Sequence, residues 1–330
     1  CPTCGGPATR EVDTMDTFVC SSWYYLRYPD NKNDKEAFSR EVMDKLLPVD
    51  KYIGGAEHAC MHLLYARFFT KAFHDMGYLG FDEPFLSLVH QGTILGPDGE
   101  KMSKSRGNVI SPDIFVSKYG SDTLRMYLAF GFNYIEGGPW NDNGIKSVYR
   151  FLERAERLIL KIKDLPGSKG IPDADLAYSL NYAIKHISAD IPAFSFNTAI
   201  ARLMELVNAL YKYTDAAPDG AYAKYAAKQL VLLLAPFAPH FAEEFWEILG
   251  GQYSVFNQSF PVFDEKALIR NTANLALQIN GKVKANFDVA ADATKEEIET
   301  YVLANFDKYL AGQTPKKIII IPGRIVNIVL

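Results

Sequence analysis

The stretch DKYIGGAEHACMHLLYARFFTKAFHDMG (residues 50–77) decides the fold class of this chain. A short strand signal at Tyr52 and Ile53 is followed by a glycine pair and then by a long segment with helical periodicity. Apolar side chains recur there at helical spacing (Leu64, Phe68 and Phe69), and the final glycine is placed to end the helix. A strand, a glycine turn and a helix in this order predict one unit of a parallel α/β sheet.

The residues that follow repeat the same rhythm. FLSLVHQGTIL (residues 85–95) predicts a buried strand, and the turn GPDG and a polar loop come after it. SPD (residues 111–113) is typical of a helix start, with a capping hydroxyl, a proline and an acid in the first turn. We therefore expect an α/β domain over residues 1–122 and a connecting segment over residues 123–145.

Beyond residue 145 the pattern becomes helical and then mixed. Four long stretches with helical periodicity predict a helix bundle over residues 146–266. Residues 267–330 predict a small α+β domain, because LALQINGKVKANFDV reads as two strands around Asn280 and Gly281. A helix capped by TKEE is expected from near Thr294 to Leu310, and KKIIIIPGRIVNIVL closes the chain with two more strands.

Composition limits the class of protein. The chain has 330 residues, of which 48% are hydrophobic and 22% are charged, as in an ordinary globular protein. Its net charge of -4 argues weakly against a nonspecific nucleic-acid coat but leaves a site-specific RNA partner open. No apolar run approaches the roughly 20 residues that cross a bilayer, so we expect no membrane contact. Four cysteines and no secretory signal favour a reducing, cytoplasmic location. The opening CPTCGGP reads as the middle of a longer or split protein.

The loop GEKMSKSRGNV (residues 99–109) carries cations and hydroxyls between glycines. Lys101 and Lys104 supply ammonium groups, and Ser103 and Ser105 supply hydroxyl donors. At the carboxyl end of a strand, such a loop could close over a polyphosphate and stabilise charge on a leaving pyrophosphate. A solvated surface loop is the alternative for a generic pair of lysines. The complete KMSKS is the signature loop of class I aminoacyl-tRNA synthetases.

Two other stretches carry candidate site residues. Gly54 and Gly55 would let backbone approach a ligand, and Glu57 is placed to accept a hydrogen bond from a ribose hydroxyl. We expect His58 and His62, four apart, to share one helical face. Metal binding, as in the zinc proteases, is the less favoured alternative for this pair, because such sites need Glu directly after the first His. DTMDTFVCSSWYYLRY (residues 13–28) could line a small apolar pocket with a polar rim, or form a core strand.

These stretches, in this order, resemble the leucyl-tRNA synthetase family. The resemblance extends from DTMDTF and SSWYYLRY through PVDKYIGGAEHA, QGTIL and KMSKS to FNTAIA, PFAPH, QINGKVKA and the terminal PKKIIIIPGRIVNIVL. It implies that residues 1–122 form the second half of a Rossmann-like catalytic domain. It also implies an anticodon-binding helix bundle and a C-terminal domain that reaches the tRNA elbow.

The resemblance also implies roles for matching residues. The catalytic pair would be Lys101 and Lys104, which stabilise pyrophosphate as leucine's carboxylate attacks ATP, with Mg²⁺ as the accompanying ion. ATP would be bound by Gly54, Gly55, Glu57, Gln91, Gly92, Met102, Ser103 and Ser105. Leucine would be bound by Phe18, Ser21, Tyr24, His58 and His62. The phosphates of tRNA(Leu) would be contacted by Lys282, Lys284, Lys316, Lys317 and Arg324, for each of which an exposed solubilising role is the alternative.

The chain also departs from the family pattern. None of its six histidines lies in a His-x-Gly-His motif, and the leucine ammonium-binding acid and the inserted editing domain are absent too. We expect the missing N-terminal catalytic half to be supplied in cis or in trans, and the chain alone to form no leucyl-adenylate. The alternative function is a non-catalytic RNA-binding or adaptor protein derived from a synthetase.

The four cysteines carry separate expectations. Cys1 and Cys4 form half of a zinc knuckle, and relatives often complete it with a second CxxC that this chain lacks, so bound zinc stays open. Cys20 stands where the resemblance leads us to expect an acid, and Cys60 where we expect an aliphatic residue. We expect both thiols to be small buried hydrophobes.

Overall fold

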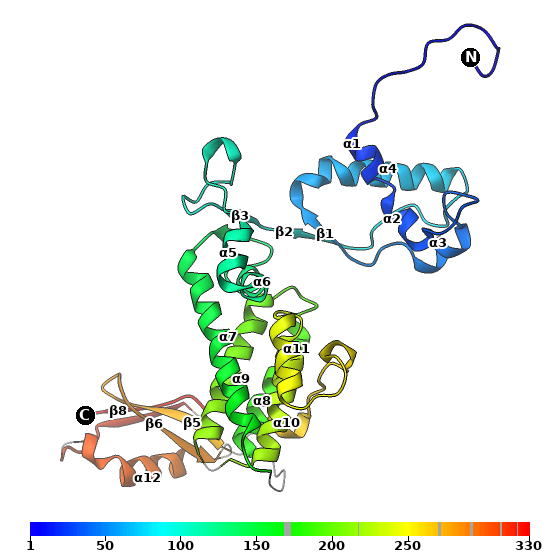
Figure 1. Ribbon diagram of the computed structural model, residues 1–330. Helices are drawn as coiled ribbons and strands as arrows, with labels where there is room; N and C mark the ends of the chain where they lie inside the picture. The colour runs from blue at the N-terminus through cyan, green and yellow to red at the C-terminus, as the bar shows by residue number, and fades with distance from the viewer. Residues whose placement is uncertain (168–172, 217, 270–271, 291–292, 311, 322) are drawn as a thin grey trace. The chain divides into compact units, whose positions relative to one another are not determined.

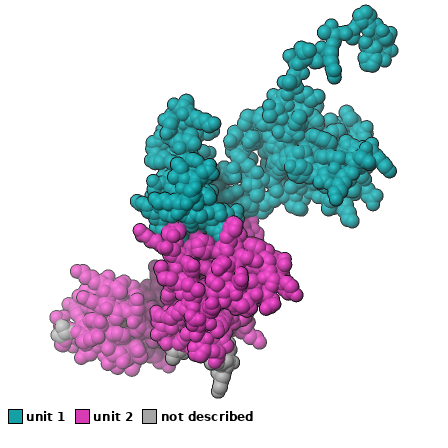
Figure 2. Space-filling model, viewed as in Figure 1, with its two compact units in different colours: residues 1–148, 194–197 teal, residues 149–193, 198–330 magenta. Residues whose placement is uncertain are grey.

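The structure, a computed structural model, describes residues 1–330 apart from 168–172, 217, 270–271, 291–292, 311 and 322 (Figure 1). It divides into two units (Figure 2). The first comprises Cys1–Val148 with Phe194–Asn197, and the second comprises Tyr149–Ala193 with Thr198–Leu330. Within the described residues, no helix is both long and apolar enough to span a bilayer.

The first unit contains two pairs of parallel strands, as the strand–turn–helix rhythm predicts. Strand β1 (Tyr52–Gly55) pairs with β2 (Leu88–Gln91), and β3 (Thr93–Leu95) pairs with β4 (Gly137–Pro139). Its helices are α1 (Thr17–Ser21), α2 (Tyr24–Arg27), α3 (Arg40–Leu46), α4 (His62–Asp75), α5 (Pro112–Tyr119) and α6 (Ser121–Phe130). As predicted, Gly77 follows the end of α4 with φ of +81°.

The prediction of one continuous buried strand over residues 85–95 is wrong. The segment forms β2 and β3, which are separated at Gly92. A Cβ on Gly92 would lie 2.0 Å from the backbone nitrogen of Gly137, so the chain meets another backbone there. Leu88 is 46% exposed, because the sheet formed by β1 and β2 has only two strands in the described chain.

Helix α4 buries a different face from the one that its apolar spacing indicates. Leu64 and Phe68 are 57% and 68% exposed, whereas Ala66 and Thr70 are fully buried. The small side chains of Ala66 and Thr70 admit the ring of Tyr25, whose hydroxyl hydrogen-bonds Thr70 Oγ1. Packing against one large aromatic side chain therefore overrides the simple apolar stripe.

The second unit contains the predicted helix bundle, drawn in green and yellow in Figure 1. Helix α7 (Asp142–Lys163) enters it from the first unit, and α8 (Ala174–Asp190), α9 (Phe196–Asp215), α10 (Gly220–Leu234) and α11 (Pro239–Ile248) follow. Asp173 caps α8 by accepting from Leu176 N, and Asp219 caps α10 by accepting from Tyr222 N. Such caps satisfy backbone donors that a helix start leaves open.

The C-terminal part of the second unit is the expected small α+β domain. Strands β5 (Thr272–Ile279), β6 (Lys282–Ala290), β7 (Lys317–Ile321) and β8 (Ile325–Val329) form a sheet in the order β6-β5-β8-β7. The predicted hairpin is confirmed, with positive φ at Asn280 and Gly281. Helix α12 (Lys295–Asn305) starts with the expected capping box at Thr294 and Glu297 but ends at Asn305, before Leu310.

The domain boundaries expected at residues 122, 145 and 266 remain predictions. The connecting segment expected over residues 123–145 contains most of α6, all of β4 and the start of α7. It therefore contributes a strand partner for β3 as well as a connection.

Candidate active site

The carboxyl ends of β1 and β2 form the floor of the candidate site. Gly54 lies opposite His90, and Gly55 lies opposite Gln91. A cavity of about 250 Å³ opens there, lined by Tyr52, Ile53, Gly54, Gly55, His58, His62, Leu63, Leu88, Val89, His90 and Gln91. Open backbone at the ends of parallel strands is the usual place for a ligand in an α/β sheet.

The two predicted histidines do not share a helical face. His58 lies in a 3₁₀ turn (Ala56–Cys60), and the backbone breaks at Met61 before α4 begins at His62. The prediction of one continuous helix is therefore wrong. The break still brings the rings together, edge to face, with centroids 6.1 Å apart.

A second cavity joins the glycine turn to the signature loop. It measures about 450 Å³ and is lined by Gly55, Glu57, Gln91, Gly92, Thr93, Ile94, Lys101, Leu128, Phe132, Asn133, Tyr134 and Gly137. Four predicted nucleotide contacts and one predicted catalytic lysine therefore share one cavity. Lys104 is exposed and does not line it, nor do Met102, Ser103 and Ser105.

Predicted leucine contacts gather in an aromatic cluster. The Phe18 ring lies edge-on to His58 with centroids 6.2 Å apart, and the Tyr24 ring lies 6.4 Å from that of His62. Ser21 is the exception, since its hydroxyl donates to Thr17 O within α1 and it lines neither cavity. The Nδ1 atoms of both histidines are buried without a hydrogen-bond partner in the described chain.

Tyr52 connects this cluster and was missed by the sequence reasoning. Its hydroxyl lies 2.7 Å from His62 Nε2 and 2.6 Å from the Tyr24 hydroxyl, and its ring stacks on Phe85 at 3.8 Å. Burial, followed by the hydrogen bond to Tyr24, raises the pKa of Tyr52. A sequence signal for Tyr52 was available. A tyrosine lies in the predicted strand directly before the glycine pair, and a buried tyrosine hydroxyl needs a hydrogen-bond partner.

The pKa of His62 gives a prediction about stability. Burial, and then the neighbouring His58, lowers the pKa of His62 below its ordinary value of 6.5. The unfolded chain therefore takes up this proton more readily, and the stability present above about pH 6.5 falls as the pH drops below it. We expect His62→Gln to flatten this pH dependence in urea unfolding. The control, His74→Gln at an exposed histidine, should keep the wild-type slope; an unchanged slope in His62→Gln would contradict the assignment.

The predicted tRNA contacts are all exposed on the C-terminal domain. They lie on β6, at the start of β7 and before β8: Lys282, Lys284, Lys316, Lys317 and Arg324. The sequence reasoning missed a second basic surface on α7. Arg150, Arg154, Arg157 and Lys161 are exposed there at spacings of three or four residues, which places them on one helical face.

The described cysteines do not complete a metal site. Cys1 and Cys4 are exposed and free, and no group of three or more His, Cys, Asp or Glu side chains in the described residues could hold an ion. Two thiols alone do not supply the four ligands of a structural zinc site. Cys20 and Cys60 are exposed, so the prediction that they are buried is wrong. Both lie in short helical turns that contain no buried residue.

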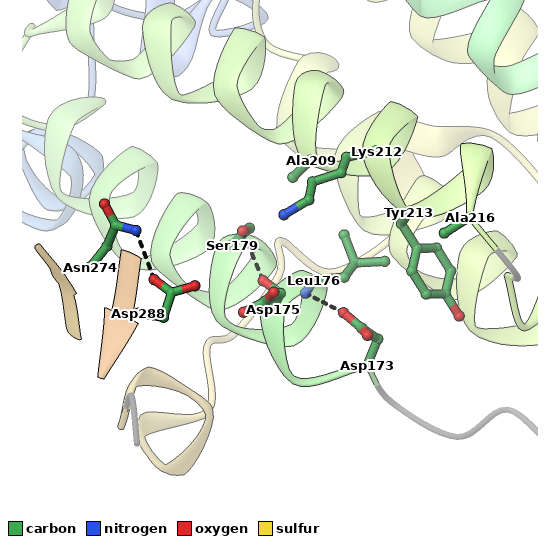
Figure 3. Close-up of a pocket in the computed structure, with 10 residues that line it drawn as sticks. All are labelled: Asp173, Asp175, Leu176, Ser179, Ala209, Lys212, Tyr213, Ala216, Asn274 and Asp288. Atoms are coloured by element: carbon green, nitrogen blue, oxygen red, sulfur yellow. Dashed lines mark hydrogen bonds between the residues drawn. The ribbon is translucent and has the colours of Figure 1, made fainter. Parts of the chain in front are cut away.

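A third cavity, of about 380 Å³, lies in the second unit (Figure 3). Its polar side chains mostly serve the fold. Asp173 accepts from Leu176 N, and Asp288 accepts from Asn274 Nδ2 at 2.7 Å. Lys212 also lines it. None of the predicted site residues lies in this cavity.

Comparisons with known proteins match the order of these features. Residues 5–136 match the family of class I tRNA synthetases (I, L, M and V), and residues 173–300 match the anticodon-binding domain of tRNA ligases. Leucine--tRNA ligases from Caldanaerobacter subterraneus subsp. tengcongensis and Clostridium kluyveri are 58% and 56% identical over the whole chain. The chain spans 42% of the length of each.

Solved structures of tRNA synthetases also resemble this chain. The LeuRS of Agrobacterium radiobacter K84, in a ternary complex with tRNA and LeuAMS, has a TM-score of 0.77 at 38% identity. The matched region comprises 100% of this chain and 44% of the LeuRS chain. A Mycobacterium tuberculosis methionyl-tRNA synthetase bound by methionyl-adenylate shares the fold, with a TM-score of 0.54 at 17% identity over 69% of this chain and 48% of its own. Residues 5–136 therefore match the class I tRNA synthetase family, and the chain is homologous over its whole length to part of leucine–tRNA ligases.

Proposed function

We propose that this chain is the second catalytic half of a leucine–tRNA ligase together with its tRNA-binding domains. The enzyme activates leucine with ATP and transfers it to tRNA(Leu). One observation carries the proposal: Gly55, Glu57, Gln91 and Gly92 meet Lys101 in one cavity, beside the histidine–aromatic cluster. A non-catalytic adaptor would have no use for a lysine in a nucleotide cavity.

The chemistry assigned to this cavity is adenylate formation. A carboxylate oxygen of leucine attacks the α-phosphate of ATP, a new P–O bond forms, and the bond to pyrophosphate breaks. Negative charge then builds on the leaving pyrophosphate, which enters as the magnesium complex of ATP. Lys101, which lines the cavity, would stabilise this charge, and Lys104 would join it when the loop closes. Such preorganised cations lower the barrier because they favour the transition state over the ground state.

The nucleotide and the amino acid would occupy neighbouring places. Glu57 would accept a hydrogen bond from a ribose hydroxyl, and Gly54 leaves room, since a Cβ there would meet nothing within 4 Å. The leucine side chain would lie against the rings of Phe18, His58 and His62. The hydroxyl of Tyr52 lies 2.7 Å from His62 Nε2, and this hydrogen bond would orient the His62 ring before substrate arrives.

An exchange assay tests the proposed function and its amino-acid selectivity. The first catalytic half is joined to this chain, and ATP–pyrophosphate exchange is measured with leucine, isoleucine, methionine and valine. We expect exchange above background with leucine, and at least about tenfold less with each of the others. The chain without the first half should show none. Exchange driven equally by another of these amino acids, or tRNA binding without any exchange, would contradict the proposal.

A binding assay tests the tRNA-binding role of α7. Arg150 and Arg157 lie two turns apart and form no ion pair among the described residues. We expect the double variant Arg150→Ala/Arg157→Ala to weaken tRNA(Leu) binding about tenfold and to reduce the dependence of log K on log salt by about 1 to 2. Arg202→Ala is the control, because Glu205 already pairs with Arg202 at 2.8 Å. An unchanged salt dependence in the double variant would remove α7 from the interface.

A further inference from the structure

Asn108 closes the signature loop through its side chain. Its Oδ1 accepts a hydrogen bond from Ser103 N at 2.8 Å. Its Nδ2 donates to Asp98 Oδ2 at 3.0 Å and lies 3.4 Å from Lys101 O. One amide therefore contacts three points of the loop, two of which belong to the KMSKS segment.

Asp98 completes this arrangement from the other end of the loop. Its Oδ1 accepts from Glu100 N at 3.1 Å, which orders the chain directly before Lys101. The hydrogen bonds from Glu100 N and Asn108 contribute to lowering the pKa of Asp98, so the carboxylate stays charged at neutral pH. Gly96 makes room for the pair, because a Cβ there would lie 2.7 Å from Asp98 Oδ1 and 3.0 Å from Asn108 Nδ2.

An ion pair across the loop is a weaker side-chain contact. Arg106 and Glu100 form an ion pair at 3.1 Å, but their side chains are 57% and 64% exposed. Exposed ion pairs contribute little to stability because water and salt screen them. Backbone contacts also close the loop, from Gly96 N to Glu100 O at 2.8 Å and in the bridge between Leu95 and Lys101, and Asp98 and Asn108 add side-chain hydrogen bonds to them.

We propose that Asp98 and Asn108 form a clamp that positions Lys101 and Ser103 for pyrophosphate. Both are positioning residues, since they act through the KMSKS segment that lies between them. The clamp follows from the hydrogen bonds alone, and its catalytic consequence rests on the proposed function.

Limited proteolysis of the 330-residue chain tests the clamp without any substrate. Trypsin cuts after Lys101, Lys104 and Arg106, and cleavage of an ordered loop follows the population of its open form. We expect Asn108→Asp, which replaces a donor by a second carboxylate, to speed cleavage at these sites about tenfold. The double variant Asp98→Asn/Asn108→Asp restores a donor opposite an acceptor and should return to within about threefold of the wild-type rate. Glu100→Gln is the control, because it removes only the exposed ion pair and should leave the rate unchanged.

Two results would overturn the clamp. One is an Asn108→Asp rate equal to that of the wild type, and the other is a double variant cleaved as fast as the single one. Rescue by exchange of the two side chains also excludes general unfolding as the cause of cleavage.

Exchange kinetics of the joined enzyme then test positioning. Asn108→Asp should lower kcat about tenfold with little change in the KM for leucine, and the double variant should recover kcat. A loop that opens in proteolysis without any loss of kcat would overturn the positioning role. Absence of exchange in the wild-type joined enzyme would instead count against the proposed function, while the proteolysis result would still decide the clamp.

Discussion

Replacing Lys101 and Lys104 together by alanine is expected to lower leucine-dependent ATP–pyrophosphate exchange at least about a thousandfold. Both ammonium groups come from one exposed loop, and Lys101 lines the cavity that we propose for the nucleotide. The departing pyrophosphate concentrates negative charge, which the two ammonium groups would stabilise. Removing two cations should therefore raise the barrier and leave the ground-state complex largely intact.

The single variants and a control make this result specific. Lys101→Ala should have the larger effect if the loop stays as described, and Lys104→Ala should equal it if closure brings both lysines to pyrophosphate. Lys118→Ala is the control, because its ammonium group is exposed on α5, over the Tyr119 ring. A double variant within about tenfold of the wild-type rate would show that the loop is not the site of pyrophosphate stabilisation.

The second large effect is expected from Gly92→Ala, and it concerns stability. A Cβ at this position would lie 2.0 Å from Gly137 N and 2.3 Å from Glu136 C. These are backbone atoms of the segment that forms β4, so no side chain can rotate away to make room. We expect a loss of about 3 kcal/mol in the free energy of unfolding of the first unit. Urea unfolding, followed by circular dichroism, measures it.

Gly54→Ala provides a matched comparison. A Cβ on Gly54 would meet nothing within 4 Å, so the stability should change by less than about 0.5 kcal/mol. The same variant should weaken nucleotide binding if ATP passes close to this backbone. Equal stability of the two variants would contradict the assignment of Gly92 to a backbone contact.

Local signals in the sequence predicted much of this fold. The short strand signal at Tyr52 and Ile53, the glycine pair and the helical periodicity after it predicted β1 and α4, and Asn280 with Gly281 predicted the C-terminal hairpin. Contacts between residues close in the sequence decide the helix and the hairpin turn, so a single sequence carries the information for them. The capping box at Thr294 belongs to the same class.

What the sequence could not predict depends on partners distant in the chain. The exposure of Leu64 follows from the way in which Tyr25 packs on the opposite side of α4, 41 residues from Ala66. Gly92 interrupts a strand because Gly137 approaches it, and Tyr52 matters because Tyr24 and His62 reach its hydroxyl. None of these contacts is indicated by the residues next to it in the sequence. Motif resemblance supplied the residues of the site, and the structure supplied Tyr52, Asn108 and the helix break at Met61.

The exposed strand pair β1 and β2 has a practical consequence for handling this polypeptide. Ile53, Leu86 and Leu88 are 44%, 67% and 46% exposed on and beside a parallel sheet, whereas such sheets are ordinarily covered on both faces. Apolar side chains beside open strand edges promote aggregation between copies. We therefore expect a purified sample to aggregate more readily as its concentration rises, and a polypeptide that covers β1 and β2 to keep it dispersed.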